Sequence, residues 1–120
     1  MKLNHLDLQV SDVPAAVAFF ERYFDFEPQS KRTSEAIAFL SDRHGFTFVV
    51  QRAKDGVPAY PDGFHFGFLV DDEATVRDLH ARMRADGVPA VSEVIVNGRG
   101  TMFYVTGPGP ALIEVSCRKH

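Results

Sequence analysis

Two histidines, His5 and His65, hold the same place in two similar segments that a constant offset of 60 residues relates. Each opens a run in which apolar and polar residues alternate, the pattern of a half-buried strand with the histidine on its polar face. Glu114 takes the corresponding face of a later strand, because Ile113 and Val115 have the opposite parity. Two imidazoles and one carboxylate from different strands form a ligand set for a divalent metal such as Fe, Mn, Ni, Co or Zn.

Each of these residues also has a simpler interpretation. A single histidine or glutamate on a strand is usually an ordinary polar residue on a solvated face. The repeated placement of the two histidines favours the metal set of His5, His65 and Glu114. The fourth equivalent position is Val49, which cannot bind a metal.

The elements that must position these residues follow from periodicity and from turn chemistry. Asp12 and Asp72 are side chains suited to cap helices, and each precedes a run with helical period. The segments rich in Gly and Pro separate the remaining apolar runs, which are typical of strands. The first half is predicted to contain strands at 5–10, 36–40 and 46–50 and a helix at 13–24; the second, strands at 64–70, 91–96, 101–106 and 111–116 and a helix at 74–85.

The chain is therefore an internal repeat of a strand, a helix and further strands, with about 55 residues per unit. We expect one domain that contains a first module at 1–52, a loop at 53–63 and a second module at 64–120. A unit of this size buries too little apolar surface to be stable alone, so the modules must pair, either within the chain or across a dimer.

Composition excludes several partners. The chain has 120 residues, 45% of them hydrophobic, and a formal net charge of −3, so we expect no nucleic-acid partner. No apolar run approaches the ~20 residues of a membrane helix, so we expect no membrane partner. The single cysteine, Cys117, and the absence of an initial secretory pattern predict a cytoplasmic protein. The eleven phenylalanines favour either a stiff core or an apolar pocket, and Phe39, Phe48 and Phe103 are compatible with both.

The pattern of these motifs resembles the vicinal oxygen chelate superfamily, which includes glyoxalases, bleomycin-resistance and fosfomycin-resistance proteins and extradiol dioxygenases. The resemblance covers nearly the whole chain and rests on Asn4-His5-Leu6-x-Leu8-x-Val10-x-Asp12, His65-Phe66-Gly67-Phe68-x-Val70-x-Asp72 and Leu112-Ile113-Glu114. It implies an α+β fold of two paired βαβββ modules that form a cupped mixed β-sheet with the helices outside. It also implies a homodimer and a metal inside the cup, with ligands at His5, His65 and Glu114.

Within this superfamily, Val49 stands where a glyoxalase would carry a further ligand, and Gln51, which has the same parity, is an alternative fourth ligand if the register shifts. The resemblance therefore favours a fosfomycin-resistance-like or dioxygenase-like metal enzyme acting on a small oxygen-chelating substrate. Tyr104 matches a substrate-side tyrosine of the fosfomycin-resistance group. Arg99 lies in a predicted turn, where a guanidinium is either solvated or available to an anionic substrate. Asp7 departs from that group, because a carboxylate beside the first ligand repels a phosphonate. The alternative is a metal-free protein that binds a drug-like ligand, as bleomycin-binding relatives do.

Overall fold

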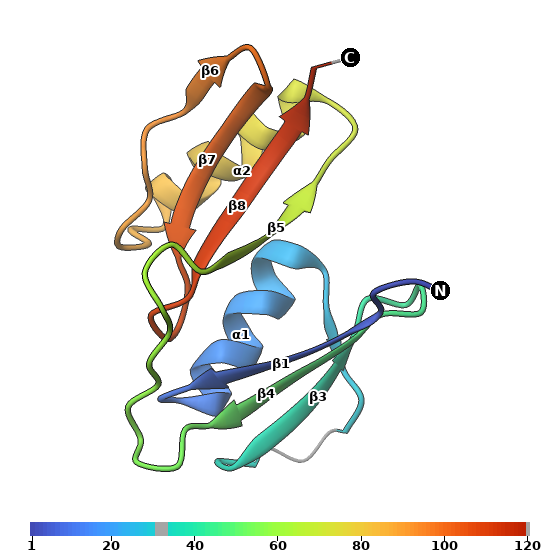
Figure 1. Ribbon diagram of the computed structural model, residues 1–120, viewed down its shortest axis with the longest axis vertical. Helices are drawn as coiled ribbons and strands as arrows, with labels where there is room; N and C mark the ends of the chain where they lie inside the picture. Colours follow the sequence, from blue (N-terminus) through green and yellow to red (C-terminus); the bar gives the residue numbers. More distant parts are fainter. Residues whose placement is uncertain (31–33, 120) are drawn as a thin grey trace. The chain divides into compact units, whose positions relative to one another are not determined.

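The computed structural model describes residues 1–30 and 34–119 and divides them into two compact units (Figure 1). The first unit comprises Met1–Ala59 with Pro108–Pro110, and the second comprises Tyr60–Gly107 with the segment from Ala111 onward. Each unit contains one helix and one four-stranded sheet, which confirms the predicted α+β class. No helix in the described ranges is both long and apolar enough to cross a membrane.

In the first unit, the helix α1 packs against one face of the sheet. Its N-terminus is capped by the Asp12 side chain, which accepts a hydrogen bond from the backbone N–H of Ala15 at 3.0 Å. Phe20 anchors the helix on the sheet, with its ring centroid 4.6 Å from that of Phe48. The sheet has the order β1-β4-β3-β2, with β1 parallel to β4. The elements are β1 (His5–Val10), α1 (Val13–Phe24), β2 (Glu27–Pro28), β3 (Ile37–Ser41) and β4 (Thr47–Arg52).

The second unit repeats this arrangement. Its sheet has the order β5-β8-β7-β6, and β5 runs parallel to β8 as β1 does to β4. The Asp72 side chain caps α2 by accepting a hydrogen bond from the N–H of Thr75 at 2.7 Å. The helix packs on β7 and β8. The elements are β5 (His65–Leu69), α2 (Glu73–Ala85), β6 (Ile95–Asn97), β7 (Gly100–Thr106) and β8 (Leu112–Arg118).

The strand register shows which positions of the two units are equivalent. Asp7 is opposite Val49 in the first sheet, and Gly67 is opposite Glu114 in the second. Since the offset of 60 relates residues 7 and 67, Val49 is the counterpart of Glu114, as the sequence predicts. On the neighbouring strand of each sheet, Phe39 pairs with Val49 as Tyr104 pairs with Glu114. The positions of Tyr104 and Glu114 in the second unit are therefore occupied by the apolar residues Phe39 and Val49 in the first.

Two strand predictions require correction. The expected strand at 91–96 is confirmed only at its end, because Val91 makes only an isolated bridge to Val105 and regular pairing begins at Ile95 in β6. The hydroxyl of Ser92 accepts a hydrogen bond from the backbone N–H of Tyr104 at 2.9 Å, so a side chain replaces part of the ladder there. The two-residue strand β2 was not predicted, since it forms by pairing with β3 and its own sequence shows no alternation of apolar and polar residues.

The structure also assigns the ambiguous phenylalanines. Phe48 and Phe103 are buried on the helix-facing sides of their sheets and belong to the core. Phe39 points to the opposite face and is 47% exposed. Phe64 precedes β5, is 37% exposed and stacks on Tyr60 at a centroid distance of 4.9 Å. Among these four, Phe39 and Phe64 are therefore the residues accessible to a ligand.

Candidate functional site

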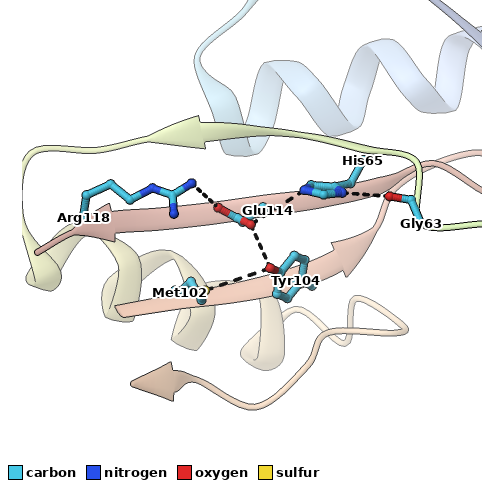
Figure 2. A network of polar contacts seen from close by, with 6 residues as sticks. All are labelled: Gly63, His65, Met102, Tyr104, Glu114 and Arg118. Carbon is cyan, nitrogen blue, oxygen red and sulfur yellow. Dashed lines mark hydrogen bonds and ion pairs between the residues drawn. The ribbon is translucent and has the colours of Figure 1, made fainter. Parts of the chain in front are cut away.

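A cluster of polar side chains lies on the face of the second sheet that is turned away from α2 (Figure 2). His65 comes from β5, Tyr104 from β7, and Glu114 and Arg118 from β8. The register places Tyr104 directly opposite Glu114. Arg118 shares the parity of Glu114, so both side chains leave the strand on the same face.

Glu114 is at the centre of the cluster, and its side chain is only 9% exposed. The hydroxyl of Tyr104 donates a hydrogen bond to Oε1 at 2.7 Å, and Nη2 of Arg118 donates to Oε2 at 3.2 Å. Burial alone would raise the pKa of the Glu114 carboxyl, but the hydrogen bond from Tyr104 and the nearby positive charge of Arg118 outweigh it, and the pKa lies below its ordinary value. The site therefore presents a carboxylate that stays ionised at neutral pH.

His65 is oriented by the main chain of the segment before it. Its Nδ1 lies 2.9 Å from the carbonyl oxygen of Gly63. Because a carbonyl oxygen can only accept, Nδ1 carries the hydrogen of this contact, and in the neutral ring Nε2 keeps the lone pair. Nε2 lies 3.9 Å from Oε1 of Glu114. This is the arrangement of a metal-binding histidine, whose other nitrogen donates to a carbonyl group.

Tyr104 is held through its main chain as well as its hydroxyl. Ser92 accepts from the Tyr104 N–H through its side chain and donates its own N–H to the Tyr104 carbonyl at 2.8 Å. The hydrogen bond to Glu114 raises the pKa of the Tyr104 phenol, burial adds to this, and the more distant charges of Arg99 and Arg118 act against it. The phenol therefore remains protonated beyond its ordinary range and can donate a hydrogen bond.

Gly67 allows β5 to approach the main chain of β8 closely at Glu114. A side chain at this position would begin 2.5 Å from the Glu114 carbonyl oxygen and 3.0 Å from its Cβ, closer than packed atoms tolerate. The parallel pairing of β5 with β8 therefore needs a residue without a Cβ opposite Glu114.

The other predicted site residues belong to a turn of the second unit or to the first unit. Arg99 is in the turn between β6 and β7, where its backbone N–H is bound by Asn97 at 2.9 Å. His5 opens β1 in the first unit and is exposed. Gln51 lies on β4 of that unit and donates its Nε2 hydrogens to the Asp7 carboxylate at 2.7 Å.

Two of the three predicted ligands, His65 and Glu114, lie close together within the second unit. Within the described ranges, no group of three His, Cys, Asp or Glu side chains is arranged to hold a metal ion. The two donors themselves fit a divalent cation, because a free imidazole Nε2 and an ionised carboxylate oxygen lie near each other on one face. Sequence reasoning missed Arg118 and Ser92, although the parity of Arg118 with Glu114 was available as a signal.

Comparison with known proteins identifies the family. The sequence model of the Glyoxalase/Bleomycin resistance protein/Dioxygenase superfamily matches residues 2–115, so the chain belongs to this superfamily. A structure described as a possible glyoxalase from Bacillus cereus is similar to it, with 34% identity, coverage of 98% of this chain and 99% of that one, and a TM-score of 0.79. No curated protein sequence matches the chain.

More distant structures share the fold. A lactoylglutathione lyase from Agrobacterium tumefaciens has 20% identity and a TM-score of 0.76, with 97% of this chain and 92% of that chain covered. The fosfomycin resistance protein FosX from Listeria monocytogenes has 22% identity and a TM-score of 0.77, with 99% and 94% covered. Since these relatives are named for different activities, the fold alone leaves the reaction open.

Proposed function

We propose that the protein is an enzyme that uses a divalent metal, Fe, Mn, Ni, Co or Zn, bound by His5, His65 and Glu114. The metal supplies a Lewis acid for a small substrate that chelates it through two neighbouring oxygens. The observation that carries the proposal is the geometry of His65, whose Nδ1 is engaged by the Gly63 carbonyl while Nε2 faces the ionised Glu114. An ordinary surface histidine has no need of this arrangement.

The neighbouring residues have distinct roles in the proposal. Tyr104 keeps its proton, so its hydroxyl orients Glu114 and offers a hydrogen-bond donor to a substrate oxygen. Arg99 supplies a cation to an anionic substrate group, which its electrostatic influence on Tyr104 supports. Gln51 is a candidate fourth ligand only through its amide oxygen, because its nitrogen is bound to Asp7. Val49 leaves the first unit without a carboxylate at the position equivalent to Glu114, which favours fosfomycin-resistance-like or dioxygenase-like chemistry over glyoxalase chemistry.

The proposed ligands come from both units, and the protein is proposed to act as a homodimer. His5 belongs to the first unit, whereas His65 and Glu114 belong to the second. The three meet either within one chain or across two copies of it, as closed two-fold assemblies permit. The single cysteine fits a reducing compartment, so the proposed location is the cytoplasm.

Metal binding by the purified protein tests the proposal. Elemental analysis and calorimetric titration with Co²⁺ are expected to give one ion per set of three ligands. His5→Ala, His65→Ala and Glu114→Gln are each expected to weaken binding by at least a hundredfold, because each removes a direct ligand. The matched control is His44→Ala, whose side chain lies in the exposed turn after β3. No Co²⁺ binding by the wild type, or equal binding by all variants, would contradict the proposal.

The substrate class is tested by turnover of the metal-loaded protein. Fosfomycin with a thiol, and catechols with Fe(II) and O₂, are the probes for the two favoured reactions. A methylglyoxal–thiol adduct is the probe for glyoxalase chemistry. Turnover of this adduct and of neither other probe would reverse the proposed ranking.

A second function, metal-free binding of an apolar ligand, is favoured by a different observation. Both oxygens of Glu114 already have hydrogen-bond donors within the protein, Tyr104 and Arg118. Phe39 and Leu69 are also exposed on the faces turned away from the helices. This function predicts no retained metal and a ligand-dependent rise in Tm that survives Glu114→Ala. Loss of that rise in the Glu114→Ala variant would refute it.

A further inference from the structure

Arg118 is bound to the same carboxylate that the proposed metal requires (Figure 2). Its Nη2 lies 3.2 Å from Oε2 of Glu114, and its side chain is 41% exposed whereas that of Glu114 is 9% exposed. The contact is therefore a charge-assisted hydrogen bond at the edge of a buried group. Such bonds are stronger than those between neutral partners, and at 3.2 Å this one is longer than is typical of the class.

The backbone shows that this contact requires an extended arginine. Residues four apart on a strand are separated by ~13 Å, so the side chain must run back along β8 to reach Glu114. It passes the level of Ser116, which has the same parity and is fully buried. An arginine at the end of a strand can also extend its side chain into water. The side chain of Arg118 instead lies along the strand and contacts Glu114, which indicates that the carboxylate attracts it.

Close packing of β7 against β8 fixes the backbone position of Arg118. Arg118 is paired with Gly100 of β7, which has φ +140°. A side chain at Gly100 would collide with the Cys117 carbonyl oxygen. The glycine therefore allows β7 to approach the end of β8 and defines the position from which Arg118 extends.

We propose that Arg118 is an internal competitor of the divalent cation for Glu114. This inference rests on the proposed metal-binding function. With no cation bound, the guanidinium compensates the buried carboxylate and keeps it ionised. A cation at Oε1 and a guanidinium at Oε2 repel each other across one carboxylate, in a partly buried site where the screening by water is reduced. Cation binding therefore has to displace or weaken the contact between Arg118 and Glu114, and the arginine lowers the affinity of the site.

Calorimetric titration of the full chain with Co²⁺ tests this inference without any assay of activity. Arg118→Gln is expected to bind Co²⁺ about tenfold more tightly than the wild type, which is the effect of losing one charge-assisted hydrogen bond to a partly exposed competitor. Arg118→Lys keeps the charge and is expected to stay within about threefold of the wild type. Arg118→Met is a second neutral variant, for use if the glutamine disturbs the end of β8.

The control is Arg77→Gln, because Arg77 forms an ion pair with Glu73 four residues away in the same unit, at 2.9 Å. It is expected to leave Co²⁺ affinity unchanged. Unchanged or weaker binding by the neutral Arg118 variants would overturn the inference, as would an equal gain in Arg118→Lys. If the wild type binds Co²⁺ and only these expectations fail, the proposed function stands. If neither the wild type nor the neutral variants bind Co²⁺, both proposals fail. If only the neutral variants bind Co²⁺, the inference is supported and the proposal of a resident metal in the wild type is contradicted.

Discussion

Replacing Tyr104 with phenylalanine removes a single hydroxyl group from the site and keeps the ring. The hydroxyl donates to Oε1 of Glu114 at 2.7 Å, and the acceptor side chain is 9% exposed. Hydrogen bonds to charged groups contribute ~1.5–3 kcal/mol to stability. Arg118 still holds Oε2, and Tyr104 is only half-buried, so we expect the lower end of this range, a loss of about 1.5 kcal/mol. For a chain of this length that corresponds to a decrease in Tm of about 6 °C.

The assay combines urea unfolding followed by circular dichroism with NMR titration of the Glu114 carboxyl. Because the Tyr104 hydrogen bond lowers the pKa of Glu114, the variant is expected to show a higher pKa for this carboxyl than the wild type. Tyr60→Phe is the matched control, since Tyr60 stacks on Phe64 and lies outside the carboxylate cluster. Unchanged stability together with an unchanged Glu114 pKa would refute the account of the site given above.

Three further outcomes follow from the same cluster. Gly67→Ala is expected to lower the free energy of unfolding by about 2–3 kcal/mol, because its Cβ would lie 2.5 Å from the Glu114 carbonyl oxygen; an unchanged urea midpoint would contradict this. The depressed pKa of Glu114 stabilises the fold above the unfolded pKa, and this stability is lost as the pH falls through the folded value. Urea midpoints between pH 7 and pH 3 should therefore fall more steeply for the wild type than for Glu114→Gln, and parallel profiles would argue against the shift. Ser92→Ala is expected to lower Tm by ~4 °C, because the Tyr104 N–H loses its acceptor. Thermal melts of this variant and of Ser30→Ala, the control, measure the difference.

Local signals in the sequence were sufficient for most of the fold. Helix caps at Asp12 and Asp72 and clear periodicity defined both helices to within a residue. Strand alternation placed His5, His65 and Glu114 on the polar faces. The segment near Val91 was mispredicted because its hydrogen bonds go partly to the Ser92 side chain, a tertiary contact that alternation does not encode.

The site was less accessible to sequence reasoning, because its contacts depend on register and side-chain reach. The pairing of Tyr104 with Glu114 requires the β7–β8 register, which no local pattern specifies. Arg118 was not identified, because its parity with Glu114 places both on one face but does not show that its side chain reaches four residues back along the strand. Gly63 was interpreted as a loop residue, whereas its carbonyl orients His65.

The partner of His65 has a consequence for how the protein is dissected experimentally. The acceptor is a main-chain carbonyl in a turn where Gly63 has φ +80°, so no side-chain deletion removes it. Alanine scanning will therefore report that His65 acts alone, even though its tautomer depends on a neighbour. Only an edit of the backbone, such as an ester in place of the peptide bond between Gly63 and Phe64, weakens that oxygen as an acceptor. The orientation of the ring is thus encoded in chain geometry and not in a replaceable functional group.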